Sequence, residues 1–276
     1  MGLQAWFSFN MLRSMVSFCL VLLFMMSAGC SRLFVPAQKL PAPEKPAVSP
    51  VEIDKLKERS DFWREYQCKF RLRVDSKTSK FSSRAIVLVK GRHFVRFETF
   101  TPLGQTAALY VSNETGPAVL IPSEKAIFTA RSPETLVRQF LGVNLPVDLF
   151  RWVLAASIPP EQFDRIESRP YAGGAWLLIS KAEWSNFEWQ ISAGKPALQG
   201  LIVHMGDIVP QVFRVSYDPP VELTKEAVPG KILIFGNDWN MEITVEDLKA
   251  APQFQPSSFY MPQLPDMRKV DLDNIK

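Results

Sequence analysis

Residues 93–121 read HFVRFETFTPLGQTAALYVSNETGPAVLI and contain three short runs rich in apolar residues. The runs cover residues 93–100, 105–111 and 118–121, and the segments between them contain Pro, Gly and Asn. Runs of this length and composition, bounded by turn residues, predict β-strands joined by tight connections. This stretch therefore indicates a mainly β protein built from sequential antiparallel strands.

The flanking sequence extends the same pattern in both directions. Residues 51–66 predict an amphipathic helix, and residues 67–74 alternate apolar and polar side chains as a half-exposed strand does. Near the middle, Ser132 is placed to cap a helix that ends at Gly142, and a second helix begins at Pro146. Further strands are expected at residues 84–90, 126–129, 175–180, 187–192, 198–205, 211–217, 231–235 and 239–245. About eleven strands with two inserted helices predict a large antiparallel sheet that curls or closes around the helices.

The N-terminus has the architecture of an export signal. Residues 15–28, MVSFCLVLLFMMSA, are apolar, follow the lone Arg13 and are too short to span a bilayer comfortably. Small residues then precede Cys30, in a pattern that resembles the lipobox of bacterial lipoproteins and implies cleavage before Cys30 and its lipidation. An ordinary signal peptide, or an uncleaved anchor with an incidental cysteine, is the alternative.

The domain boundaries follow from composition. We expect a signal peptide at residues 1–29, and a lipidated tether at residues 30–50, where five prolines after Leu33 oppose regular structure. One folded domain is expected at residues 51–265, with a C-terminal tail at residues 266–276.

Composition and motifs favour binding over catalysis. The 276 residues are 47% hydrophobic and 22% charged, with a net charge of +4, which gives little support for nucleic-acid binding. His93 and His204 have no companions at metal-ligand spacing, and the sequence has no nucleophile elbow or phosphate loop. We therefore expect no enzyme activity, catalytic residue, metal or cofactor. Cys68, on an apolar strand position, is expected to be a buried and unreactive thiol.

Two segments carry a resemblance to a known family. Residues 97–106 read FETFTPLGQT, and residues 136–152 read LVRQFLGVNLPVDLFRW. Together, and at this spacing, they resemble LolB, the outer-membrane lipoprotein receptor of the Lol pathway; the similarity is strongest over residues 84–160. The resemblance implies an unclosed antiparallel β-barrel whose helices form a lid over a hydrophobic cavity for lipoprotein acyl chains.

The resemblance also implies partners and site residues. The implied partners are a periplasmic LolA-like carrier, acylated lipoproteins and outer-membrane phospholipid. The protein itself is expected to be a lipid-anchored monomer on the periplasmic face of the outer membrane. Leu103 matches a protruding leucine that acts in membrane insertion; packing of Leu103 beneath its own loop is the alternative. Alternation and resemblance together suggest Val95, Phe97, Leu109, Phe140 and Trp152 as lining of the cavity and lid.

Departures from the pattern keep a second function open. Ala155 and Ala156 stand where the family has a glycine after the second helix, and residues 253–262, QFQPSSFYMP, resemble the end of LolA-type chains. The strand aromatics are equally consistent with an ordinary core and with an acyl-chain pocket. A lipid sensor or structural scaffold of the same fold is therefore the alternative to a lipoprotein receptor.

Overall fold

The computed structural model describes residues 50–77, 80–143, 145–170, 176–182, 185–192, 196–205 and 211–274. By its internal contacts the chain divides into a unit at residues 45–276 and an N-terminal segment at residues 1–44. The expected signal peptide, Cys30 and most of the tether lie outside the described residues.

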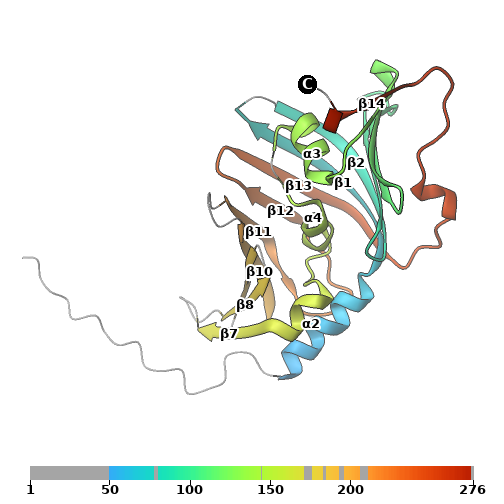
Figure 1. Ribbon diagram of the computed structural model, residues 1–276. Coiled ribbons are helices and arrows are strands. Elements are labelled where there is room, and N and C mark those ends of the chain that lie inside the picture. Colours follow the sequence, from blue (N-terminus) through green and yellow to red (C-terminus); the bar gives the residue numbers. More distant parts are fainter. Residues whose placement is uncertain are drawn as a thin grey trace, which may run out of the picture. The chain divides into compact units, whose positions relative to one another are not determined.

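One sheet of fourteen strands dominates the described part of the chain (Figure 1). Its order is β14-β6-β5-β4-β3-β2-β1-β13-β12-β11-β10-β9-β8-β7, so the first strand lies in the middle. The strands are β1 (Glu65–Ser76), β2 (Lys80–Lys90), β3 (Phe94–Phe100), β4 (Thr106–Asn113), β5 (Gly116–Ile121), β6 (Ala126–Thr129), β7 (Ile166–Pro170), β8 (Trp176–Ala182), β9 (Ser185–Ile191), β10 (Ala197–Met205), β11 (Gln211–Glu222), β12 (Lys231–Phe235), β13 (Trp239–Ala250) and β14 (Arg268–Asp271).

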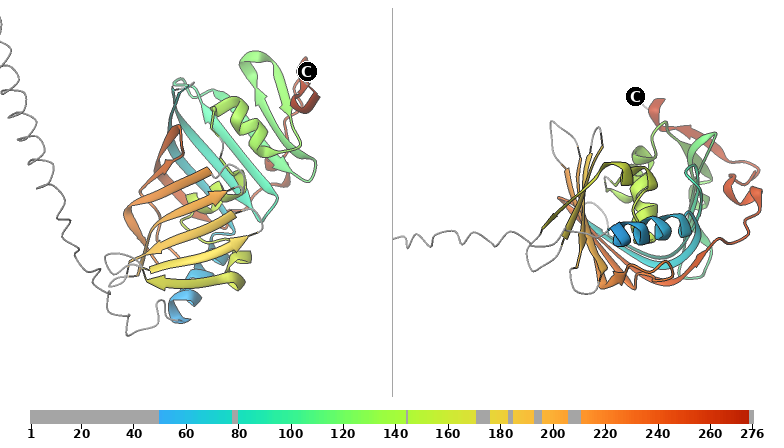
Figure 2. Two further views of the ribbon diagram at one scale, coloured as in Figure 1. Left: turned by 60° about the vertical axis from the view of Figure 1, so that its left-hand side comes forward. Right: turned by 90° about the horizontal axis from the view of Figure 1, so that it is seen from below.

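The sheet curls without closing. Its end strands β14 and β7 do not pair with each other, and the sheet wraps around the helices (Figure 2). The predicted unclosed barrel is thus confirmed. The sheet exceeds the expected number of about eleven strands; the two strands with no counterpart among the expected ranges are β7 (IESRP) and β14 (RKVD), whose short, polar sequences give no strand signal. β14 also pairs with β6 in parallel, whereas the other pairs are antiparallel.

Three α-helices accompany the sheet: α2 (Pro50–Phe62), α3 (Pro133–Leu141) and α4 (Val147–Leu154). As predicted, the Ser132 side chain caps α3 by accepting from the backbone N–H of Glu134, and Gly142 ends it at φ +67°. α2 ends four residues earlier than predicted, because Tyr66 belongs to β1, where it begins the row of inward-facing side chains. Short 3-10 helices lie at Pro122–Glu124 (η1), Pro160–Arg165 (η2), Pro256–Phe259 (η4) and Leu272–Asn274 (η5).

The end of α4 explains one departure from the family pattern. The N–H of Ser157 donates to the Trp152 carbonyl and that of Ala156 to the Val153 carbonyl, which is the Schellman arrangement. It requires a left-handed residue, and Ala156 takes that conformation at φ +48°. The position therefore keeps a left-handed backbone of the kind that favours glycine, although a side chain there adds steric cost.

A buried arginine ties α2 to this helix end. Arg59 is 0% exposed, and its guanidinium donates to the carbonyls of Ala156 (2.8 Å), Ala155 (2.7 Å) and Thr224 (2.6 Å). Burial lowers the Arg59 pKa to about 10, so the side chain stays charged near neutral pH. Three carbonyls thus take the place of a counter-ion, and one side chain joins α2, α4 and the β11–β12 loop.

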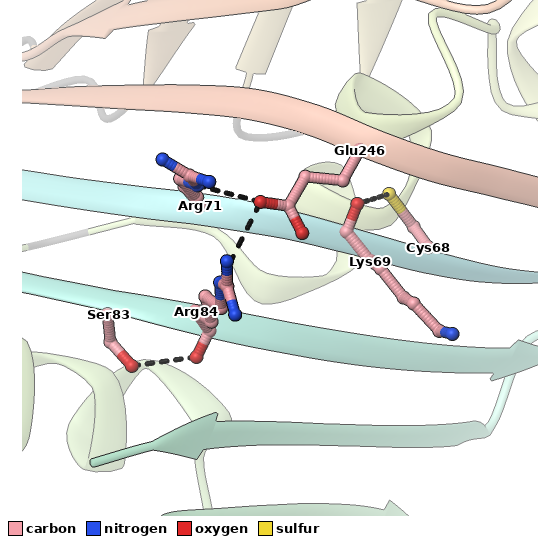
Figure 3. Close-up of polar contacts among 6 residues, drawn as sticks. All are labelled: Cys68, Lys69, Arg71, Ser83, Arg84 and Glu246. Atoms are coloured by element: carbon pink, nitrogen blue, oxygen red, sulfur yellow. Dashed lines mark hydrogen bonds and ion pairs between the residues drawn. The ribbon is translucent and has the colours of Figure 1, made fainter. Parts of the chain in front are cut away.

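A β-bulge shapes the outer surface of the central strands. The pairing of β1 with β13 shifts between Lys69 and Phe70, which leaves Glu246 as an extra residue. Its carboxylate lies 2.7 Å from Arg71 and 3.9 Å from Arg84, two arginines directly opposite each other on β1 and β2 (Figure 3). The bulge therefore supplies the negative charge that offsets an unfavourable cross-strand pair.

The C-terminal residues cover the outer face of one sheet wall. Residues 251–274, here called the C-terminal strap, include η4, which contacts β3 and β4, and end at β14 on the edge of β6. Two methionines of the strap, Met261 and Met267, pack against a separate apolar cluster formed by Leu109, Val111 and Leu120. This wall is consequently apolar on both faces.

Candidate functional site: an apolar cavity and an exposed leucine

A cavity of about 260 Å³ lies between the sheet and the helices. Strands β1 to β5 and β13 form one wall, and α3 and α4 form the other. Only three of the described lining residues, Thr99, Tyr110 and Arg151, carry polar side-chain atoms. The lining is Leu72, Phe81, Val87, Val95, Phe97, Thr99, Ala107, Ala108, Tyr110, Val119, Ile121, Leu136, Val137, Phe140, Leu141, Leu145, Val147, Phe150, Arg151 and Met241.

The structure brings three of the five suggested lining residues together. Val95 and Phe97 line the cavity from β3, and Phe140 lines it from α3. Leu109 does not, because Ala108 and Tyr110 are the inward residues of β4 while Leu109 packs under the C-terminal strap. Strand alternation alone could not choose the inward residue on a wall that is apolar on both faces.

Trp152 is also absent from the cavity lining. α4 presents Val147, Phe150 and Arg151 to the cavity, which is the i, i+3, i+4 spacing of one helix face. Trp152 follows on the other side of the helix and lines a second pocket of about 170 Å³. The second pocket has charged residues from α4 and from the segments around it, namely Arg92, Asp148, Arg151 and Glu161.

Arg151 lies where the two spaces meet. It lines both of them, is 4% exposed, and donates from Nη1 to the carbonyls of Gly91 (2.9 Å) and Arg92 (2.6 Å). Burial lowers its pKa, while Asp148 and Glu161 act in the opposite direction. Its own backbone carbonyl accepts from the Tyr66 hydroxyl, and burial raises the Tyr66 pKa well above its ordinary value. Sequence patterns missed Arg151 because an arginine on a short helix normally indicates a solvent-facing position.

Leu103 projects from a tight turn between β3 and β4. Within TPLGQ, the Gly104 N–H donates to the Thr101 carbonyl (2.9 Å), and the Thr101 N–H donates to the Gln105 carbonyl (2.8 Å). Pro102 restricts the backbone ahead of Leu103, and Gly104 supplies the left-handed residue at φ +80°. The Leu103 residue is 88% exposed, so it does not pack beneath its own loop.

Cys68 is buried on β1, and burial raises its thiol pKa to about 12. Thiolate is the reactive form, and the shift from 9.0 leaves very little of it at pH 8. In protein beginning at Ser31, we expect Cys68 to react with a disulfide reagent at least about 100-fold more slowly than in the unfolded chain. Equal rates before and after adding denaturant would show that the thiol is accessible.

Two searches of the described residues are negative. They contain no group of three or more His, Cys, Asp and Glu side chains placed to hold a metal ion. Within the same residues, no helix is both long and apolar enough to cross a membrane.

Comparison with known proteins agrees with this geometry. The model of the family "Outer membrane lipoprotein LolB" matches residues 64–192, which include β1 to β9 with α3 and α4. Over these residues the chain therefore resembles LolB. No curated protein sequence matches it significantly.

Solved structures share the fold at very low sequence identity. A DUF1329 family protein from Desulfovibrio piger ATCC 29098 is 9% identical over 78% of this chain and 98% of its own, with a TM-score of 0.51. A proposed outer membrane lipoprotein-sorting domain from Vibrio parahaemolyticus is 10% identical (76% and 94% covered; TM-score 0.48). A LolA superfamily protein from Nitrosomonas europaea is 11% identical (76% and 96% covered; TM-score 0.44).

The family match and the fold together suggest a role in lipoprotein binding or localisation. An apolar cavity and a protruding leucine fit such a role.

Proposed function

We propose that the protein receives acylated lipoproteins from a periplasmic LolA-like carrier and inserts them into the outer membrane, to which lipidated Cys30 anchors it. The apolar cavity bounded by β1–β5, β13 and the two helices is the observation that carries this proposal. Its volume of about 260 Å³ is near the lower end of the roughly 300–1,000 Å³ of small-molecule sites, so longer acyl chains would require the helices to yield.

The transfer would be driven by differences in burial. An acyl chain gains roughly 0.8 kcal/mol for each CH₂ removed from water, so it moves to whichever apolar environment buries it best. Neither nucleotide nor metal is needed for such a step. Leu103 would then insert into the bilayer and bring the loaded cavity close to it. The bilayer would be the final acceptor of the acyl chains.

The decisive experiment uses soluble protein that begins at Ser31, incubated with a purified complex of carrier and acylated lipoprotein. We expect affinity capture of the protein to recover the lipoprotein in a time-dependent manner, with the carrier released empty. Lipoprotein that lacks its acyl chains is the matched control and should not be transferred to the protein. If folded protein acquires no acylated cargo, the receptor proposal is wrong, and a lipid sensor or scaffold takes its place.

A further inference from the structure

The apolar cavity contains two buried polar groups without a full hydrogen bond from the folded protein. Arg151 Nε has no acceptor in the described part of the chain, and Tyr110 Oη interacts only with the Ser112 side chain, short of full hydrogen-bond geometry. Both side chains line the cavity, Tyr110 from the sheet wall and Arg151 from the helix wall. Because burial without a partner is costly, such groups are rare in native structures and often lie at functional sites.

Arg151 is held as a fixed donor. Its Nη1 bonds to the Gly91 and Arg92 carbonyls, and its guanidinium carbon lies 5.0 Å from the centroid of the Trp152 ring. These contacts restrict the side chain and leave Nε as a buried nitrogen without an acceptor among the described residues. A ligand acceptor that reached it would therefore meet a donor already in position, at little cost in side-chain entropy.

The surroundings of Arg151 change from apolar to polar. On one side is the apolar cavity, and on the other is the second pocket with Arg92, Asp148, Glu161 and Gln162. An amphiphile lying across this boundary would place its hydrocarbon chain in the cavity and its polar head in the second pocket. The group that joins chain to head would then lie beside Arg151.

We propose that this boundary recognises the carbonyl group that links an acyl chain to its head, with Tyr110 Oη and Arg151 Nε as hydrogen-bond donors. The inference rests on the proposed function and adds to it a requirement for a carbonyl-bearing chain. Ester and amide carbonyls occur both in the lipid-modified cysteine of a lipoprotein and in a phospholipid. These two sources share the chemistry that the cavity recognises.

The test compares ligands that differ only in the carbonyl. Protein beginning at Ser31 is titrated with short-chain phosphatidylglycerol in its diester and diether forms, and with a dipalmitoylglyceryl-cysteine peptide and its dialkyl counterpart. Displacement of a fluorescent fatty-acid probe gives each Kd. We expect the carbonyl form to bind about tenfold more tightly than the ether form, since two hydrogen bonds are lost in the latter. If the ratio of ether Kd to ester Kd is larger for the phospholipid pair, the natural ligand is a phospholipid. If it is larger for the cysteine-peptide pair, the natural ligand is a lipoprotein.

Two conservative variants separate recognition from folding. Tyr110→Phe should weaken binding of the carbonyl ligand by about 2- to 10-fold, leave ether binding unchanged and change Tm little, because the hydroxyl it removes interacts only with the Ser112 side chain, short of full hydrogen-bond geometry. Tyr217→Phe is the matched control, since that hydroxyl donates to the Val153 carbonyl (3.1 Å) and Tyr217 does not line the cavity. It should lower Tm by about 2–4 °C and keep the preference for the carbonyl ligand.

Arg151→Lys gives a second test, because lysine keeps the charge but has no Nε–H. It should also reduce the preference for the carbonyl ligand. Equal binding of carbonyl and ether forms by the unmodified protein would overturn carbonyl recognition and leave acyl-chain binding intact. If no chain-bearing ligand binds, both this inference and the proposed function are overturned.

Discussion

Leu103→Glu is expected to reduce membrane delivery of lipoproteins by about 10- to 100-fold while leaving their acceptance from the carrier unchanged. Transfer of one exposed leucine into hydrocarbon contributes roughly 1.5–3 kcal/mol, and a glutamate in its place loses this gain and resists insertion. Leu103 is 88% exposed on a turn fixed by backbone hydrogen bonds, so the substitution should not disturb the fold. Delivery is measured as lipoprotein recovered with liposomes, and acceptance by affinity capture.

Val228→Glu is the matched control for Leu103→Glu. Val228 is 49% exposed in the β11–β12 loop, whose Thr224 carbonyl binds Arg59 of α2. The C-terminal end of α2 is near the start of β3, since the Gly91 N–H donates to the Arg64 carbonyl. Leu103 follows the other end of β3, which at 3.3 Å per residue is about 20 Å from the start of the strand. The loop that contains Val228 and the turn that contains Leu103 are therefore near opposite ends of β3. Val228→Glu should keep full delivery; equal loss in both variants would exclude a specific role for Leu103, and no loss in either favours a sensor or scaffold.

Arg59→Met is expected to cost about 3–5 kcal/mol of unfolding free energy, because it leaves three buried carbonyls without a charged donor. This corresponds to a fall in Tm of about 10 °C for a chain of this size. Since the side chain joins α2 to the end of α4, α4 should also become mobile, which hydrogen exchange of its amides would detect.

Arg71→Met provides the comparison for the buried arginine. The Arg71 side chain is 64% exposed and pairs with Glu246, and exposed ion pairs contribute at most about 1 kcal/mol. Removing it also relieves the repulsion with Arg84 on the facing strand. If thermal unfolding shows Arg59→Met to be no less stable than Arg71→Met, the contacts of Arg59 do not hold α2 in place.

Local sequence signals predicted the elements well where they were strong. Ser132, Gly142 and the apolar face between them defined α3 to the residue, and strand alternation located β1 and its neighbours. The resemblance to LolB added the open barrel, which periodicity alone left undecided between curling and closing. β14 could not be predicted, because its pairing with β6 comes from the path of the C-terminal strap and not from its own apolar content.

The site was predictable only in part, for a physical reason. Val95, Phe97 and Phe140 line the cavity because each lies on the inward, apolar face of its strand or helix. Leu109 was misplaced because the strap makes both faces of its strand apolar, a fact that no local pattern contains. Arg59 and Arg151 were overlooked because their acceptors are backbone carbonyls far away in the sequence, and such partners leave no motif.

The C-terminal strap also bears on how the protein is made. Its methionines cover Leu109, Val111 and Leu120, and its final strand occupies the edge of β6. Both surfaces are formed by residues that leave the ribosome well before the strap does. Until the C-terminal strap has been synthesised and has docked, an apolar patch and an unpaired strand edge are exposed together. This combination promotes association between chains. Newly made molecules should therefore depend on general chaperones until the last residues have docked.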